Sequence, residues 1–453
     1  MRFVGLIIIF TSLPIFIALL KSNPEKRVWA YFIIGFMPFT AGWLNLDASI
    51  INYAGWPGHT KGLIITLMDS MALAILFTSA APLRKLPIFG IFLFYIFSAI
   101  LSIVVSYQPM MSGLYAFQLV RVIVVFIAVA SIMRDPKAIH WLSYGMAAGA
   151  ILQGAITIDQ RLSGVVQASG TMGHQNLLGF MLHFVTLPLM ALMLAGKMHK
   201  LYILGVLFAL IAIALGASRG TVGFAAIGLT LLLGLSMLRQ MTSHKVKILG
   251  LSVLAFAMVA PVVVGTFERR FKDSPIELGR DSERVAFERA AKSMWSDHPM
   301  GVGANQYVIV SNTQGYAQRA GVIWNYGSRS AHVHQLYLLA AAETGWLGMF
   351  SLIGLFGWTI LRGFTFAFGN RRDPRGDVIL GASIAVLVAA FHSLYEWIFV
   401  AAPVQYVFAI SLGIIAGTIR QVKLEKRLNA RMSARRANNM NEITSDSPIV
   451  RAS

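Results

Sequence analysis

The sequence contains no cysteine and few charged residues. Cysteine is absent from all 453 residues, which excludes disulfide bonds and thiolate metal sites. Asp, Glu, Lys and Arg together make up 13% of the chain, against about a quarter in soluble domains, and 57% of the residues are hydrophobic. The mean hydropathy is +0.67. This composition excludes a soluble globular enzyme and favours a chain that lies largely in a membrane.

Motifs that would identify a nucleotide or metal site are also missing. The sequence has no P-loop, no dinucleotide-binding glycine fingerprint and no His-Glu-x-x-His zinc motif. His332 and His334 are two residues apart, the wrong spacing for two metal ligands on one helical face. We therefore expect neither a resident metal nor a soluble cofactor.

Apolar segments of membrane-crossing length recur from one end of the chain to the other. About 20 apolar residues are needed to cross a bilayer as a helix. The segments lie near residues 2–20, 28–45, 62–81, 86–106, 117–133, 140–157, 174–194, 201–216, 220–238, 248–265, 335–361, 378–395 and 402–419. The first lacks a small-residue cleavage site, so we expect a retained helix rather than a signal peptide. The predicted fold is all-α and polytopic, with 13 transmembrane helices, or 12 if the first segment lies at the interface.

The distribution of Lys and Arg predicts the orientation. Most of the 38 basic residues fall in one alternating set of loops and in the tail, and such loops mark the cytoplasmic side. The net charge of +19 then reflects topology, and no folded basic domain suggests nucleic acid as a partner. We expect membrane helices in residues 1–265, a periplasmic loop in 266–334, further membrane helices in 335–420 and a basic cytoplasmic tail in 421–453.

The predicted periplasmic loop is the one long loop. It runs for about 65 residues, and loops of that length are usually functional. Within it, "SERVAFERAAKSMWSD" predicts a helix with Asp281 as its N-cap, ended by Pro299, Gly301 and Gly303. The loop is thus expected to be partly helical.

A set of polar residues falls near the non-cytoplasmic ends of the apolar segments, where topology does not explain them. Ionisable groups there are costly and usually face a cavity or a partner. One arginine of this kind is more often a snorkelling anchor, and a lone histidine often only bonds a neighbouring helix. Together they predict a polar cavity that opens outward, in which arginine forks would suit a lipid pyrophosphate. The set is Arg2, Lys61, Arg121, Arg161, Arg219, Gln153, His174, His183, His392 and Glu396.

The end of the long loop resembles a known family. "HQLYLLAAAETGWLG" fits the pattern His, then Asn, Ser or Gln, nine residues, Gly, two residues, Gly, here His334, Gln335, Gly345 and Gly348. This is similar to the signature of the bacterial O-antigen ligase and polymerase superfamily. We expect its two glycines to allow close packing of helices.

Four further stretches resemble segments of that superfamily, in the same order. They are "ASGTMGHQNLLGF", "ASRGTVGF", "SERVAFERAAKSMWSDHPMGVGANQY" and "HSLYEW". In the first, Met172 replaces the usual aromatic residue and His174 is unusual. The resemblance covers about residues 168–397, and the first 150 residues match only as generic membrane helices.

The resemblance implies a GT-C-like, metal-independent glycosyltransferase of the bacterial inner membrane. Such enzymes transfer a glycan from undecaprenyl pyrophosphate to an acceptor at the periplasmic face. We expect His334 to be the general base of an inverting reaction, with His332 as the alternative base. Arg161, Arg219 and Arg284, with Arg121 as a further candidate, would bind the pyrophosphate. Supporting roles are expected for His332, Gln335, His174, Asn176 and Glu396.

The sequence leaves the acceptor open. A ligase extends lipid A–core, a polymerase extends another lipid-linked repeat, and a protein O-oligosaccharyltransferase extends a protein. The histidine motif favours the first two, whereas "HSLYEW" favours the second and third. A protein of a different functional class, a transporter of lipid-linked glycan or of small anions, is the remaining alternative. In either case membrane lipids surround the helices. Transporters often carry internal repeats and midplane charges, and neither is apparent, which favours the enzyme.

Overall fold

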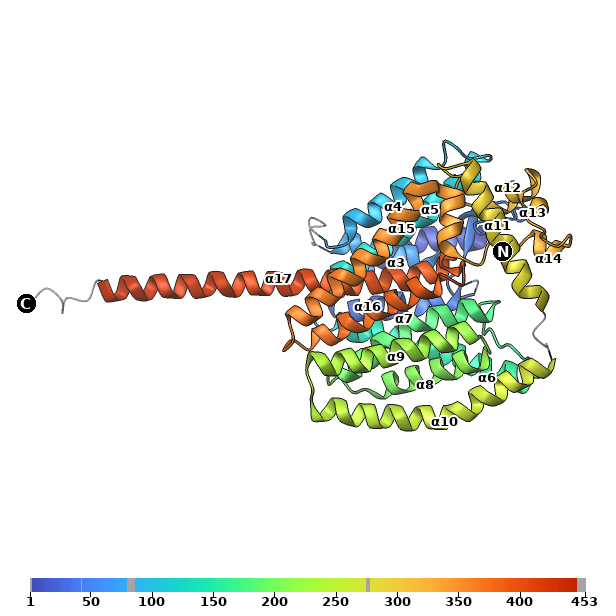
Figure 1. Cartoon of the computed structure of the whole chain (residues 1–453). Helices are drawn as coiled ribbons and strands as arrows, with labels where there is room; N and C mark the ends of the chain where they lie inside the picture. Colours follow the sequence, from blue (N-terminus) through green and yellow to red (C-terminus); the bar gives the residue numbers. More distant parts are fainter. Residues whose placement is uncertain (1, 42, 80–85, 274–277, 446–453) are drawn as a thin grey trace, which may run out of the picture.

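A computed structural model describes residues 2–41, 43–79, 86–273 and 278–445, and helices make up almost all of it (Figure 1). Within these ranges, nine helices are long and apolar enough to cross a membrane. They are α1 (Arg2–Ser22), α5 (Pro109–Ile132), α6 (Ala138–Leu162), α7 (Gln175–Leu194), α9 (Arg219–Arg239), α10 (Ser243–Asp273), α15 (Leu336–Gly369), α16 (Arg375–His392) and α17 (Ala402–Ser445). The chain is a multi-pass membrane protein, as predicted.

The other four apolar segments form shorter helices. At 1.5 Å per residue the 16-residue α8 is ~24 Å long, less than the ~30 Å of a hydrocarbon core. Each predicted segment therefore contains a helix, but in the described ranges nine of them, rather than 12 or 13, have full length. The short ones are α2 (Arg27–Phe36), α3 (Leu67–Thr78), α4 (Phe89–Leu101) and α8 (Lys200–Leu215). Three 3-10 turns accompany the helices, η1 (Pro24–Lys26), η2 (Met37–Thr40) and η3 (Ile398–Val400).

A β-hairpin interrupts the helical pattern, which the sequence did not predict. β1 (Ala48–Asn52) and β2 (Gly62–Ile65) pair antiparallel, and β2 occupies the start of a segment expected to be helical. The helix starts later because Thr66 and Asp69 form a capping box. The hydroxyl of Thr66 accepts from the backbone N–H of Asp69, whose carboxylate accepts from the N–H of Thr66 at 2.8 Å.

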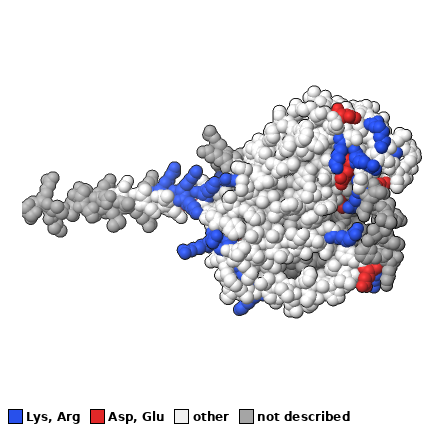
Figure 2. Space-filling model, viewed as in Figure 1, with Lys and Arg blue, Asp and Glu red and all other residues white. Residues whose placement is uncertain are grey.

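The helix ends gather at two faces of the molecule. One face carries the N-terminus and the helices that lie between α10 and α15; we call it the loop end (Figure 1). From the opposite face, the tail end, α17 projects far beyond the bundle. In the view of Figure 2 the charged residues at the tail end are Lys and Arg, whereas both signs occur at the loop end. α7 is almost wholly buried in the bundle and α10 almost wholly exposed.

The segment between α10 and α15 is partly helical, as predicted. It holds α11 (Leu278–Asp297), α12 (Tyr307–Thr313), α13 (Tyr316–Arg319) and α14 (Tyr326–Arg329). The predicted N-cap was wrong: α11 already includes Leu278, so Asp281 lies inside the helix.

α15 is broken at Gly345, whose φ of 65° and ψ of −164° are not helical. A Cβ at this position would lie 2.5 Å from the carbonyl oxygen of Pro299 and from the carbonyl carbon of Met300. The expectation that Gly345 serves helix–helix packing was therefore wrong, because the missing side chain makes room for the segment between α10 and α15, which we call the outer segment. Three backbone hydrogen bonds join the two segments there. They run from Val302 N to Ala342 O (3.0 Å), from Gly303 N to Glu343 O (2.8 Å) and from Trp346 N to Pro299 O (3.2 Å).

Candidate functional site

His334 and Glu396 meet at the loop end. His334 lies two residues before the start of α15, and Glu396 lies in the turn that follows α16. The backbone N–H of Leu336 donates to the carbonyl of Ser393 at 2.9 Å, which fixes the start of α15 against that turn. Nδ1 of His334 is 3.4 Å from Oε2 of Glu396. The histidine side chain is 31% exposed and the carboxylate 7% exposed.

Two more elements supply partners to Glu396. Asn176, in the first turn of α7, donates from Nδ2 to Oε1 at 2.7 Å. Arg284, on α11, places Nη2 4.0 Å from the same oxygen and is 48% exposed. His174 precedes α7 and caps it, accepting from the N–H of Asn176 at 3.2 Å. The structure therefore brings together four elements that are far apart in the sequence around one carboxylate.

The surroundings of Glu396 keep it ionised. Burial alone would raise the pKa of Glu396, but the hydrogen bond with His334 and the charges of His334, His392 and Arg284 outweigh it, so the pKa lies below its ordinary value. A carboxylate that accepts from Nδ1–H leaves Nε2 of His334 as the basic nitrogen. Partial desolvation lowers the pKa of His174 against the opposing charge of Glu396, which favours the neutral ring whose Nδ1 caps α7.

Arg219 lies near this cluster on α9. Its side chain is exposed and makes no hydrogen bond or ion pair with the part of the chain that the structure describes. A Cβ on the next residue, Gly220, would lie 3.3 Å from Nε2 of His392, one turn before Glu396. Phe224 stacks on the same imidazole, with 4.9 Å between ring centroids. The first turns of α9 thus pack on the end of α16.

Residues 216–220 have the spacing Gly-x-Ser-x-Gly, which in hydrolases marks a nucleophile. Here a helix, α8, precedes the stretch instead of a strand. The hydroxyl of Ser218 accepts from the N–H of Thr221 and caps α9. This serine therefore has a structural role.

The other two arginines of the predicted phosphate site lie elsewhere. Arg161 donates from Nη1 to the carbonyls of Val165 and Val166, at 3.3 and 3.1 Å, in the loop after α6. Arg121 is buried in α5, with Nε 2.8 Å from Oδ2 of Asp69, and it also bonds the hydroxyl of Tyr406. In the described residues neither arginine contacts the cluster around Glu396. The four arginines that were predicted to bind the pyrophosphate therefore lie in three different places.

His332 is buried behind the cluster. Its ring stacks on that of Trp397, the neighbour of Glu396, with 4.1 Å between centroids. On its other sides lie Tyr307, at 6.3 Å, and His59, at 5.8 Å. The side chain is buried, so no substrate hydroxyl reaches it, which argues against His332 as the base.

The electrostatics of His332 agree with a structural role. Burial, together with the neighbouring His59, His334 and Lys61, holds the pKa of His332 well below its ordinary value. The imidazole is therefore neutral. Gln335 is also structural, because its side-chain oxygen accepts from the N–H of Leu338 at 3.2 Å and caps α15.

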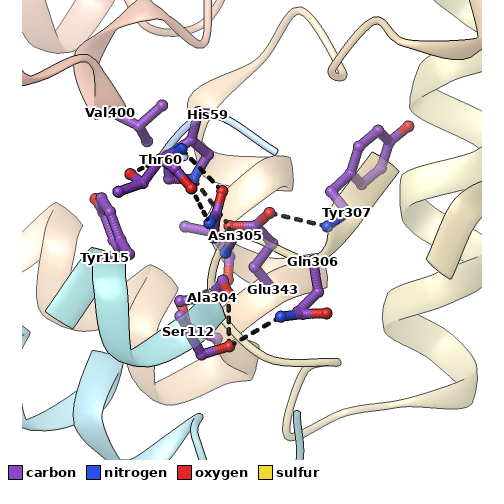
Figure 3. A network of polar contacts seen from close by, with 12 residues as sticks. His59, Thr60, Ser112, Tyr115, Ala304, Asn305, Gln306, Tyr307, Glu343 and Val400 are labelled. Atoms are coloured by element: carbon purple, nitrogen blue, oxygen red, sulfur yellow. Dashed lines mark hydrogen bonds and ion pairs between the residues drawn. The ribbon is translucent and has the colours of Figure 1, made fainter. Parts of the chain in front are cut away.

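A second carboxylate at the loop end, Glu343, was not singled out from the sequence. It is buried in α15 and accepts from the backbone N–H groups of Asn305 and Tyr307 at 2.8 and 2.9 Å (Figure 3). Nε2 of His59 lies 3.5 Å from its Oε2. An ionisable residue inside an apolar segment was a visible signal, but its partners are distant in sequence.

Asn305 extends this network to the hairpin. Its Nδ2 donates to the carbonyl of Thr60 at 2.7 Å, and its Oδ1 accepts from the N–H of the same residue at 3.0 Å (Figure 3). The indole N–H of Trp56 donates to the carbonyl of Asn305 at 3.1 Å. We call Glu343, Asn305, His59 and Thr60 the fastening network, because it ties the outer segment to α15 and to the loop between β1 and β2.

A protein-family model described as O-antigen ligase matches residues 204–353. The match runs from α8 into α15, so it includes Arg219, Arg284 and His334 but neither Asn176 nor Glu396. No curated protein matches the chain.

Proposed function

We propose that this protein is an inverting, metal-independent glycosyltransferase of the bacterial inner membrane. The proposal starts from the O-antigen ligase family domain in residues 204–353. Its donor is a glycan linked to undecaprenyl pyrophosphate. Its acceptor is a hydroxyl of lipid A–core or of another lipid-linked glycan. The observation that carries this proposal is the pair of His334 and Glu396 at the loop end.

The pair has the arrangement of a general base with an orienting carboxylate. Glu396 accepts from Nδ1–H of His334, so Nε2 takes the proton of the acceptor hydroxyl as its oxygen attacks the anomeric carbon of the donor. The bond from that carbon to the pyrophosphate oxygen breaks, and its electron pair leaves with the pyrophosphate. Attack opposite the leaving group inverts the configuration. The partly exposed imidazole then returns its proton to solvent.

Arg219 and Arg284 are the best placed cations for the pyrophosphate. Arg284 lies 4.0 Å from Glu396 and is half exposed, and Arg219 has no partner among the described residues, so both have free N–H donors. Arginine forks bind phosphate oxygens in pairs and stabilise charge that develops on a leaving group. Arg121, in contrast, is already neutralised by Asp69.

The charge distribution supports a periplasmic site. At the tail end the charged residues seen in Figure 2 are Lys and Arg, and cytoplasmic loops carry an excess of these residues. The loop end, with His334, then faces the periplasm, where the glycan of a lipid-linked donor would be presented.

The test is a transfer assay with purified protein in lipid vesicles. The donor is a glycan on undecaprenyl pyrophosphate, offered separately with lipid A–core, with further lipid-linked repeats and with an acceptor protein. The acceptor that is extended identifies the reaction. His334→Ala should abolish transfer, whereas His298→Ala, a loop histidine beside Tyr316, should retain it. Movement of glycan across the bilayer without transfer would instead support the hypothesis that the protein is a transporter.

A second assay tests whether Arg284 binds the donor, with Arg289 on the same helix as the comparison. Losing a charged hydrogen bond costs about 1.5–3 kcal/mol, so Arg284→Ala should raise the KM for donor about 10- to 100-fold. Arg289→Ala, also exposed on α11, is the matched control and should leave this KM unchanged. An equal effect of both variants would remove Arg284 from the phosphate site.

A further inference from the structure

A cavity of about 260 Å³ lies at the tail end of the molecule. It is bounded by the turn between α1 and α2, by the end of α3 and by the end of α5. Arg420 of α17, the helix that projects from the tail end, bonds the carbonyl of Ala130 at 3.3 Å, which places the end of α5 at this face (Figure 1). The polar lining includes Arg27, Tyr31, Thr78, Ser79, Arg134 and Asp135.

The cavity lies at the boundary between the bilayer and water. α5 has 24 residues and is ~36 Å long, slightly more than the ~30 Å of a hydrocarbon core. Its end, with Arg134 and Asp135 directly beyond it, therefore lies at the depth of the lipid headgroups. The anions present at that depth in any phospholipid bilayer are the phosphate groups of the lipids.

The two arginines of the lining have N–H donors that no protein group uses. The side chain of Arg134 is exposed and makes no hydrogen bond or ion pair with the described residues. Arg27 is half-buried, with Nε 3.1 Å from the carbonyl of Leu20 and Nη2 3.5 Å from the carbonyl of Thr78. These contacts fix the guanidinium between α1 and α3, and within the described ranges its Nη1 has no partner. Arginine forks bind phosphate oxygens in pairs, so the cavity offers donors that suit a phosphate.

The carboxylate in the lining does not occupy these arginines. Oδ2 of Asp135 accepts from the hydroxyl of Tyr31 at 3.2 Å, and Oδ1 accepts from the backbone N–H of Lys137 at 2.8 Å. Among the described residues Asp135 forms no ion pair with Arg27 or Arg134. Two arginines and one carboxylate give the lining a net charge of +1. This charge matches the single negative charge of a phosphodiester, whereas a pyrophosphate or a free phosphate carries more at neutral pH.

Apolar surface adjoins the cavity. Leu19 and Phe77, the sequence neighbours of the lining residues Leu20 and Thr78, are 52% and 66% exposed. A hydrocarbon chain attached to the phosphate would cover these side chains, which a free phosphate would leave uncovered. The cavity is also smaller than the ~300–1,000 Å³ of pockets that enclose a whole ligand. It therefore suits a headgroup whose hydrocarbon chains remain outside.

We propose that this cavity binds the phosphodiester of a membrane phospholipid, with Arg27 and Arg134 on its oxygens and the acyl chains against α1 and α3. The site lies at the face opposite the candidate site and does not depend on the proposed function. Its lining comes from three separate parts of the chain, so a bound lipid links the α1–α2 turn, α3 and α5. Because a ligand that binds only the folded state stabilises that state, the lipid should raise the stability of the bundle.

The test adds phosphatidylglycerol to the purified full chain in an uncharged detergent and follows the midpoint of thermal unfolding. Diacylglycerol with the same chains lacks the phosphate, and inorganic phosphate lacks the chains. We expect phosphatidylglycerol to raise the midpoint and the two partial probes to leave it unchanged. Arg134→Gln loses charged hydrogen bonds, so the lipid concentration at half the maximal shift should rise about 10-fold. Lys137→Gln removes a positive charge from an exposed residue outside the lining and is the matched control.

Three outcomes would overturn the proposal. Equal weakening by Arg134→Gln and Lys137→Gln would show a general attraction of the basic face for anionic lipid, without a site. A shift as large from inorganic phosphate would show that the ligand is a free anion, and one as large from diacylglycerol would show that the phosphate is not recognised. Arg27→Gln should weaken the lipid as well, but it also removes the contacts with Leu20 and Thr78. Arg134→Gln removes no contact within the described residues, so it decides alone if Arg27→Gln does not fold.

Discussion

Two buried carboxylates stand at the loop end, each beside a histidine, and they are bonded differently. Both oxygens of Glu343 accept backbone N–H groups at 2.8 and 2.9 Å, and its histidine, His59, is 2% exposed. Glu396 has one short bond, from Asn176, and longer contacts at 3.4 Å to His334, which is 31% exposed, and at 4.0 Å to Arg284. A carboxylate saturated by backbone donors holds the chain in place, whereas one with loosely held, accessible partners is available for proton transfer.

The largest effect is expected from a substitution of Glu396. Glu396→Gln keeps the shape but removes the charge that orients Nδ1–H of His334, so we expect kcat to fall by about 10²–10⁴-fold, the range of general-base catalysis. The midpoint of thermal unfolding should change little, because the side chain has few short bonds. Transfer kinetics and thermal melting measured on the same preparation check both statements. A stable variant that keeps full activity would contradict the role of Glu396.

The same substitution at Glu343 should lower the stability of the protein. Glu343→Gln points an amide N–H₂ at one of the two backbone N–H groups, and a buried unsatisfied donor costs about 1–3 kcal/mol. We expect a lower unfolding midpoint and faster proteolysis within residues 299–306, while the folded fraction keeps its kcat. If Glu343→Gln lowered kcat without loss of stability, the contrast between the two carboxylates would be wrong.

A substitution of Gly345 tests whether the contact between α15 and the outer segment requires a glycine. A non-glycine residue at φ 65° and ψ −164° is strained by about 1–3 kcal/mol, and its Cβ would collide with Pro299 and Met300. Gly345→Ala should therefore destabilise the protein by at least that amount in denaturant unfolding. Gly357→Ala, in the helical part of α15 with open space around its Cβ, should be neutral or stabilising. Equal effects at the two positions would show that the break carries no strain.

The smallest effect is a dependence of stability on pH. Because the folded pKa of His332 is depressed, the unfolded chain binds more protons than the folded chain below about pH 6.5. The stability from this group is complete above that pH and is lost as pH falls toward its folded pKa, by up to about 1.4 kcal/mol per unit. His332→Phe keeps a ring beside Trp397 and should flatten the acid side of a plot of unfolding midpoint against pH. An unchanged slope would assign the acid sensitivity to other groups.

The sequence predicted what depends on short stretches of chain. Apolar runs located the helices, and Pro299 and Gly301 marked the end of α11. The histidine motif led to His334. Partners across large separations were missed: Arg121 and Asp69 are 52 residues apart, and His59 reaches Glu343 across most of the chain. The sequence indicates which face of the membrane an arginine lies near but not on which side of the bundle it points, so it could not separate Arg121 and Arg161 from Arg219 and Arg284.

The break at Gly345 divides α15 into a short piece and a long piece. The short piece follows His334 and is hydrogen-bonded at its far end to Val302 and Gly303 of the outer segment, whereas the long piece runs into the bundle. Glu396 belongs to the bundle through α16. The short piece is also bonded to this part of the bundle, because the N–H of Leu336 donates to the carbonyl of Ser393 at 2.9 Å and the hydroxyl of Tyr337 donates to the carbonyl of Ala390 at 2.7 Å. The short piece therefore contacts the outer segment at one end and the turn that carries Glu396 at the other, so the position of the imidazole depends on both.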